Sequence, residues 1–93
     1  MKIVINVDWG GFGLSEEAYK ELGLEWDGFG YAFNGYECRT NPKLVEVVER
    51  LGSERASGRL AKLKVIEIPD GIDWILYDYD GIETVHEKHR SWS

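Results

Sequence analysis

Carboxylates and histidines gather near the C-terminal end, where they are suited to acid–base or metal chemistry. The acids are Asp78, Asp80 and Glu83, followed by His86 and His89. Neighbouring carboxylates push their pKa values apart, which lets one act as an acid and another as a base. The sequence supplies no nucleophile or oxyanion donor to accompany them. We therefore predict no catalytic residues, and a carboxylate-dependent enzyme stays as a third hypothesis.

The same histidines would bind a metal ion only if they lie in a helix. A helix puts His86 and His89 on one face with Glu83, whereas a strand points the two histidines to opposite sides. A zinc site also needs three or four protein ligands. Cys38 is the one cysteine of the chain, so it forms no internal disulfide and no thiolate cage. We expect no metal and no cofactor, and a metal-dependent enzyme belongs to the same third hypothesis.

A glycine-rich turn between a predicted strand and a predicted helix is the second feature suited to chemistry. Gly11 and Gly13 lie just before Ser15, which starts the helix. Such a turn can bind phosphate because unpaired N–H groups converge there. The glycine spacing matches neither the dinucleotide fingerprint nor the P-loop, and Glu16 and Glu17 would repel an anion. We predict a structural turn, with a small-molecule or nucleotide site at Gly11, Gly13 and Ser15 as the alternative.

Aromatic residues and glycines alternate from residue 25 to residue 36. The glycines disfavour a regular helix, and a short strand or ribbon over Phe29–Phe33 is the most regular structure that we expect. Exposed aromatics around glycines are typical of binding surfaces, whereas the alternative is that these side chains fill the core beneath a sheet. We predict that Trp26, Phe29 and Tyr31 contact a partner.

The start of the chain predicts the strand and the helix on which this turn depends. Ile3 and Ile5 alternate with Val4, so we expect a strand that is covered on both sides and central in its sheet. Ser15 is suited to cap the helix that follows, and Gly23 is suited to end it.

A second helix opens at Asn41-Pro42, where Asn caps the helix and Pro takes its first position. Its apolar residues recur at helical spacing and face the sheet. Gly52 should end it, with one further helical turn before Gly58. Three more strands are predicted over residues 63–68, 72–79 and 82–88. Together these elements predict an α+β fold, a mainly antiparallel sheet of about four strands with two helices packed on one face, as a single domain over residues 1–93.

The Asp-Gly dipeptide at residues 80–81 is the strongest hairpin signal in the chain. A two-residue turn would set the carboxylates of Asp78 and Glu83 opposite each other, which is costly unless a cation lies there. A bulged loop would instead pair Asp78 with Ile82. Apolar residues also recur at helical spacing over residues 82–92, so a C-terminal helix is the alternative to the hairpin.

Composition indicates a folded protein. Hydrophobic residues make up 43% of the chain, which is enough to bury a single core. No apolar run approaches the roughly 18 residues that a membrane-spanning helix needs. The N-terminus also lacks the pattern of a signal peptide. We therefore expect a soluble protein of the cytoplasm that has no membrane partner.

The net charge of −6 is unevenly spread along the sequence. Residues 1–37 and 65–93 each carry seven acids and two basic residues, whereas residues 38–64 carry seven basic residues and three acids. Such segregation favours electrostatic complementarity with a partner, or between layers of the protein itself, and argues against nucleic acid as a direct ligand. A sheet face rich in carboxylates could imitate a phosphate backbone. The acids predicted to contact a partner are Asp73, Asp78, Asp80 and Glu83.

Four segments of the chain resemble short uncharacterised proteins encoded in tailed-phage genomes and prophages. The segments are GGFGLSEEA (Gly10–Ala18), LGLEWDGFGY (Leu22–Tyr31), RTNPKLVEVVERLGSERASGRLAKLKVIEIPDG (Arg39–Gly71) and YDGIETVHEKHRSW (Tyr79–Trp92). The similarity covers nearly the whole chain. Many of these proteins have a longer acidic insert where this chain has the short segment Asn34–Cys38. The family has no assigned activity, so it supplies no catalytic residues.

The resemblance implies a phage accessory protein that acts in the cytoplasm of a bacterial host cell. Acidic proteins of this size and source commonly bind a host macromolecule, such as a defence nuclease, a polymerase or a CRISPR effector, sometimes as DNA mimics. The leading hypothesis is therefore a small protein that binds a host protein and inhibits or modulates it. We make no prediction of its oligomeric state.

Overall fold

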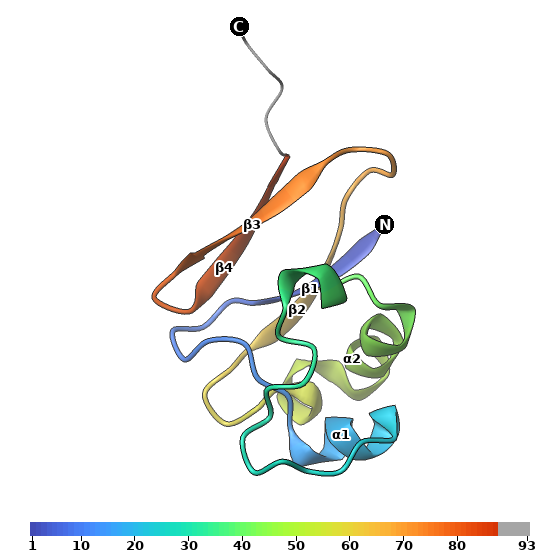
Figure 1. Cartoon of the computed structure of the whole chain (residues 1–93), viewed down its shortest axis with the longest axis vertical. Helices are drawn as coiled ribbons and strands as arrows, with labels where there is room; N and C mark the ends of the chain where they lie inside the picture. Colours follow the sequence, from blue (N-terminus) through green and yellow to red (C-terminus); the bar gives the residue numbers. More distant parts are fainter. Residues whose placement is uncertain (88–93) are drawn as a thin grey trace, which may run out of the picture.

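A computed structural model describes residues 1–87 of the chain (Figure 1). Its elements in chain order are β1 (Lys2–Asn6), α1 (Glu16–Leu22), the 3-10 helix η1 (Tyr36–Cys38), α2 (Pro42–Ala56), β2 (Leu63–Glu67), β3 (Trp74–Tyr79) and β4 (Ile82–Glu87). The α+β class predicted from the sequence is confirmed. Within residues 1–87, no helix has the length and apolar character needed to cross a membrane.

The four strands pair antiparallel, but they form two two-stranded sheets in place of one larger sheet. β1 pairs with β2, with Val4 opposite Val65, and β3 pairs with β4 in a hairpin. Loop and side-chain groups occupy the other edge of β1. The N–H of Val4 donates to the carbonyl oxygen of Arg39 at 3.0 Å, and the N–H of Asn6 donates to the Glu83 carboxylate at 2.8 Å. The prediction that this strand is central in its sheet is therefore wrong: β1 is an edge strand, and its polar groups on that side are satisfied without a ladder.

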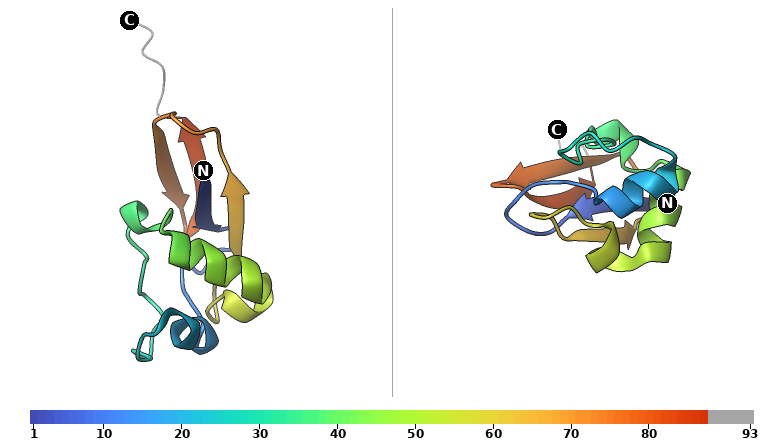
Figure 2. Two further views of the ribbon diagram at one scale, coloured as in Figure 1. Left: turned by 90° about the vertical axis from the view of Figure 1, so that its right-hand side faces the viewer. Right: turned by 90° about the horizontal axis from the view of Figure 1, so that it is seen from below.

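The larger core lies between the helices and one face of the β1–β2 sheet. α2 contacts both strands, whereas α1 packs along α2. Val4, Leu44, Val47 and Leu63 are almost completely buried at the centre of this core. Figure 2 shows α2 beside the β1–β2 sheet and α1 at the end of the molecule farthest from the hairpin.

A smaller core covers the opposite face of the same sheet. Ile3 and Ile5 of β1 pack there against Leu76 of β3, with Trp74 and Val85 partly buried around them. β1 is thus buried on both faces, as its alternation predicted. The hairpin forms the outer layer, and Figure 1 shows that it extends from the end of the molecule opposite α1.

The helix ends confirm most of the capping signals. Ser15 and Asn41 accept N–H groups from the first turns of α1 and α2, and Gly23 ends α1 with a φ of 76°. The break predicted at Gly52 is also present within α2: Gly52 has a non-helical φ of 83°, and the further turn that was expected before Gly58 runs to Ala56.

The hairpin turn has the geometry that its dipeptide predicted. Asp80 and Gly81 have φ values of 52° and 92°, and positive φ at both positions defines a type I′ turn. The register sets Asp78 opposite Glu83, so the bulged alternative is wrong. The helical alternative is also wrong for residues 82–87, which are a strand. Residues 88–92 of that alternative lie outside the described residues.

Candidate functional site

Three loops that are distant in the sequence meet at one groove of about 580 Å³. Residues 10–16 contribute the glycine turn, residues 26–31 contribute the aromatic stretch, and residues 57–61 contribute the loop after α2. The groove thus brings together two predicted sites that are separate in the sequence. The predicted site residues that line the groove are Gly11, Gly13, Ser15, Trp26, Phe29 and Tyr31.

Hydrogen bonds between backbone groups hold the three loops together. The N–H of Leu14 donates to the carbonyl oxygen of Gly30 at 2.9 Å, and the N–H of Gly58 donates to that of Gly13, also at 2.9 Å. Gly30 has a φ of 87°, and a Cβ atom at this position would overlap the carbonyl oxygen of Leu14. The close approach of the aromatic loop therefore requires glycine at position 30.

The exposed rim of the groove is aromatic. The side chains of Phe29 and Tyr31 are 71% and 59% exposed, and their rings stack with centroids 5.8 Å apart. Trp26 packs edge-on against Tyr19, with centroids 5.0 Å apart. The alternative that these aromatics fill the core is wrong for Phe29 and Tyr31, whereas Phe33 does pack against the larger core.

The predicted strand in this aromatic stretch is wrong, because side chains take the backbone donors that a ladder would use. The Asp27 carboxylate accepts the N–H groups of Phe29 and Gly30, each at 2.7 Å. The Tyr19 hydroxyl accepts the N–H of Ala32 at 2.7 Å. The loop is therefore fixed by local hydrogen bonds in place of a β-ladder.

Asp27 is a charged centre for this loop. The N–H groups of Gly30 and Phe29, together with the Tyr19 hydroxyl at 2.7 Å, lower the pKa of Asp27 from 3.8 to about 2. Burial raises the pKa of the Tyr19 hydroxyl, so this hydroxyl remains a protonated donor at neutral pH. The backbone that carries the exposed aromatics is thus fixed by a carboxylate that stays ionised at pH values well above 2.

The glycine turn is poorly equipped for the phosphate that its alternative prediction requires. The N–H groups of Leu14 and Ser15 donate to the carbonyl oxygens of Gly30 and Ala56. The Ser15 hydroxyl also has its partners, because it accepts the N–H of Ala18 and donates to a carbonyl oxygen of α2. Glu16 and Arg59 both line the groove, and their charges are opposite. The backbone and hydroxyl groups of Leu14 and Ser15 are therefore already paired and do not offer an anion site.

The predicted acids of the hairpin do not line the groove, and one of them is internal. Asp73, Asp78 and Asp80 are exposed, and Asp78 accepts the N–H of Gly81 at 2.8 Å. Glu83 is only 2% exposed, so its predicted contact with a partner at the surface is wrong. Strand alternation explains this, because Glu83 lies on the face of β4 that packs toward β1.

Glu83 instead forms a buried ion pair with Arg39. The two Nη–Oε distances are 2.5 and 2.8 Å, and both side chains are almost completely inaccessible. Arg39 also donates to the carbonyl oxygens of Val4 and Asn34. Its Cζ atom lies 3.8 Å from the centroid of the Phe12 ring, which lines the groove. The pair therefore links the hairpin, β1 and the groove.

This role of Arg39 was not predicted from the sequence, although one signal pointed to it. The predicted hairpin register set Asp78 opposite Glu83 and required a nearby cation. Nothing in the local sequence around residue 39 identified which basic residue would supply it. The cation comes from a loop 44 residues away in the chain.

No metal site forms among residues 1–87, where no group of three His, Cys, Asp or Glu side chains converges. In β4, Glu83 points inward while His86 is exposed, so they do not share a face. His89 lies outside the described residues. Cys38 is a free, half-buried thiol.

Some of the segregated charges form ion pairs between α1 and α2. Arg55 of α2 pairs with Glu17 of α1, and Arg50 of α2 pairs with Glu21 at 2.5 Å. These contacts match the expectation that oppositely charged layers of the protein attract each other. Among residues 1–87, Asp73 and Asp80 form no such pair with a basic side chain, whereas Glu83 has its buried pair with Arg39.

Comparisons with protein-family models, with characterised proteins and with solved structures find no match to this chain.

Proposed function

We propose that this protein binds a segment of another protein in the aromatic-rimmed groove. The single observation that carries the proposal is the exposure of Phe29 and Tyr31 over a groove of about 580 Å³. Large exposed aromatic side chains at the edge of a concave surface are the usual anchors of protein interfaces.

The order of the rim supports a binding role. A flexible aromatic loop would lose conformational entropy on binding, and this cost would weaken the complex. Here Asp27 and Tyr19 fix the backbone at Phe29, Gly30 and Ala32 before any partner arrives. The rim is therefore preorganised, so a partner would not have to pay the entropy cost of ordering its backbone.

The resemblance to phage-encoded proteins supports a host protein as the partner. Under this proposal the chain acts by occupying a surface of the host protein and so inhibiting or modulating it. Mimicry of DNA by the acids of the hairpin is a narrower version of the same proposal. In both versions the protein acts through a binding surface, and neither version requires a catalytic group.

The stacked rings also favour one form of the alternative function. A small molecule with a flat, uncharged ring system could stack on Phe29 or Tyr31 over the groove. Thermal-shift measurements with nucleosides and nucleotides at millimolar concentration separate this alternative from a protein partner. Saturating ligand should raise the unfolding temperature if it binds the folded chain.

The main experiment compares capture of host proteins by three forms of the chain. The test variant is Phe29→Ser with Tyr31→Ser, and the matched control is Leu24→Ser, which removes an exposed apolar side chain outside the groove. We expect the wild type and the control to retain the same host protein from a bacterial lysate. The test variant should retain about tenfold less of it.

Equal retention of the same proteins by all three forms would contradict the proposal, because the groove would then be irrelevant to capture. Retention of nothing above the level of an empty support would contradict it as well. Circular dichroism of the test variant checks that its fold is intact, which we expect because both side chains are exposed.

A further inference from the structure

The outer face of the β3–β4 hairpin is a second exposed aromatic surface, separate from the groove. Ile75, Tyr77 and Tyr79 point away from β1 and are 36%, 56% and 74% exposed. Their neighbour in β3, Leu76, points inward and is 3% exposed. One face of the hairpin is therefore packed on the protein, and the other is uncovered.

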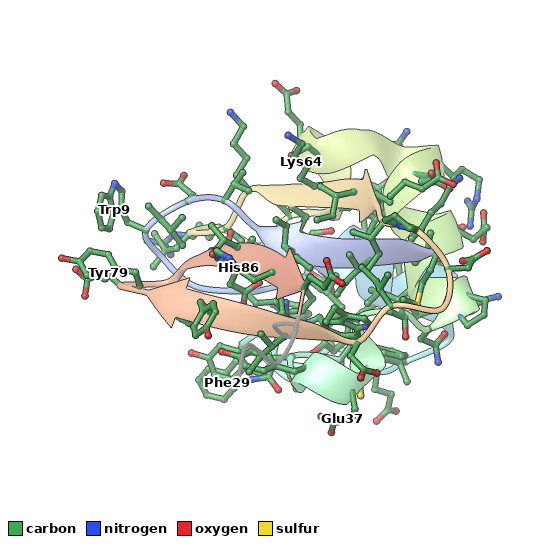
Figure 3. The ribbon with its side chains drawn as sticks, turned by 90° about the horizontal axis from the view of Figure 1, so that it is seen from above. Trp9, Phe29, Glu37, Lys64, Tyr79 and His86 are labelled. Atoms are coloured by element: carbon green, nitrogen blue, oxygen red, sulfur yellow. The ribbon has the colours of Figure 1, made fainter. Side chains whose placement is uncertain are left out.

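Trp9 extends this surface beyond the hairpin turn. Its ring contacts that of Tyr79 edge-on, with centroids 6.5 Å apart. Figure 3 shows Trp9 and Tyr79 projecting together at the turn end of the hairpin, apart from Phe29. On β4, Thr84 and His86 lie on the same outer face, and the His86 ring meets that of Tyr77 at 4.8 Å. None of these outer-face side chains is a carboxylate, lysine or arginine.

The charged side chains of the hairpin itself, over residues 72–87, are all acidic. Residues 65–87 include no lysine or arginine. Exposed carboxylates flank the tyrosines at the positions Asp73, Asp78 and Asp80. Acids of α1 are offset by arginines of α2, but the described residues show no such pairing for Asp73 or Asp80. The described residues of the hairpin therefore contribute only negative charge at the rim of the aromatic face.

We propose that the outer face of the hairpin docks a basic, arginine-rich protein segment. The guanidinium group is suited to this surface because it stacks on aromatic rings and pairs with carboxylates in the same complex. Tyr77, Tyr79 and Trp9 supply the rings, and Asp73 and Asp80 supply charge at the rim. The exposed acids of the hairpin should also favour encounter with a cationic partner.

Charge argues against the other occupants of such a face. A nucleic acid would bring its phosphates against the flanking carboxylates. A second copy of this chain would bring a net charge of −6 and its own hairpin acids against the same rim. A basic segment is not repelled by the rim acids as a nucleic acid or a second copy would be. Charge complementarity therefore favours it as the occupant.

The test uses three synthetic decapeptides titrated onto the full chain: alternating Arg-Gly, alternating Lys-Gly and alternating Asp-Gly. We expect the Arg-Gly peptide to bind, the Lys-Gly peptide to bind more weakly, and the Asp-Gly peptide not to bind. Replacement of either ring, Tyr77→Leu or Tyr79→Leu, should weaken the Arg-Gly peptide about two- to fivefold. Asp80→Asn should weaken it too, while Asn keeps the positive φ of the turn.

Two control variants make the result specific. Glu54→Gln removes an exposed acid on α2 and should leave peptide affinity nearly unchanged. Phe29→Ser removes a groove aromatic and should also leave it unchanged, so this proposal and the groove proposal can fail separately.

The proposal is overturned if the tyrosine variants bind the Arg-Gly peptide as the wild type does, or if Glu54→Gln weakens it as much as Asp80→Asn. Either result would mean that net charge attracts the peptide without a defined face. Sedimentation showing a dimer that Tyr79→Leu dissociates would overturn it in favour of a second copy. Binding of a single-stranded oligonucleotide that Tyr79→Leu abolishes would overturn it in favour of nucleic acid.

Discussion

Two regions of this molecule expose tyrosines, and they are held in place by different means. The aromatic loop that rims the groove has no regular secondary structure and depends on hydrogen bonds to Asp27 and Tyr19. The hairpin has a complete β-ladder and is joined to the remainder of the fold through the buried pair of Glu83 and Arg39. An exposed aromatic surface can therefore be ordered either by hydrogen bonds from nearby side chains or by a β-hairpin that is anchored through a buried ion pair.

The hydrogen bonds that fix the loop and the ion pair that anchors the hairpin differ in their access to solvent. The Asp27 carboxylate is exposed, so pH reaches the group that fixes the loop. The Glu83 carboxylate is inaccessible, and removal of its partner would leave a charge in the interior. The hairpin anchor should consequently be sensitive to substitution, and the loop should respond to acid between pH 4 and pH 2.

The largest effect is expected when the hairpin anchor is broken. Glu83→Gln leaves the Arg39 charge buried without its counterion, which should lower the free energy of unfolding by about 3–5 kcal/mol in urea titrations. The double variant Arg39→Met with Glu83→Leu should not restore stability, because the N–H of Asn6 and the carbonyl oxygen of Val4 also lose partners. A double variant as stable as the wild type would show that the hydrogen bonds of the pair to the backbone of Val4 and Asn6 do not contribute to stability.

The second effect tests the close contact behind the aromatic rim. Gly28 and Gly30 have nearly equal φ values, 86° and 87°, but only a Cβ at Gly30 would overlap other backbone atoms. Gly28→Ala should cost about 1–2 kcal/mol for its left-handed backbone. Gly30→Ala should cost about 2–5 kcal/mol, since the overlap with Leu14 adds to the same backbone strain. Equal losses in chemical denaturation would contradict the close approach of Gly30 to Leu14.

The third effect concerns pH and the loop. The folded-state pKa of Asp27 is about 2, below its usual 3.8. The carboxylate therefore stabilises the fold above pH 4, and this contribution is lost as pH falls through 2. Wild type should melt at a higher temperature than Asp27→Asn at pH 6, and the difference should shrink between pH 4 and pH 2. Glu54→Gln controls for net charge, and a difference that persists unchanged at pH 2 would count against the assignment.

The smallest effect is expected at the surface pairs between α1 and α2. Arg55 lowers the pKa of Glu17 by a direct hydrogen bond, but both groups are well exposed. Water and salt screen such a pair, so Arg55→Gln should lower the unfolding temperature least of the changes described here. High salt should remove the difference altogether, whereas a salt-independent loss would point to packing of the arginine stem.

Local signals predicted the elements of this fold well. Ser15, Asn41 and Gly23 cap helices as expected because each acts on its own turn of backbone. The hairpin turn was predictable for the same reason, since Asp80-Gly81 can take positive φ at both positions. The division into two sheets was not predictable, because it depends on groups from distant loops that occupy the free edge of β1.

The candidate site was predictable in its residue types and unpredictable in its assembly. Trp26, Phe29 and Tyr31 stood out by their glycine neighbours, but nothing in the sequence joined them to the turn at residues 10–16. The strand expected at Phe29 failed because Asp27 competes for its backbone N–H, a contact that Asp-Gly dipeptides can make without a sheet.

Arg39 stands between the two exposed surfaces, with its guanidinium against Phe12 in the groove wall and against Glu83 in the hairpin. Substitution of Arg39 would therefore remove a contact from the groove wall and the counterion of the hairpin at the same time. Both exposed surfaces depend on this one internal side chain for their support, although neither surface contains it.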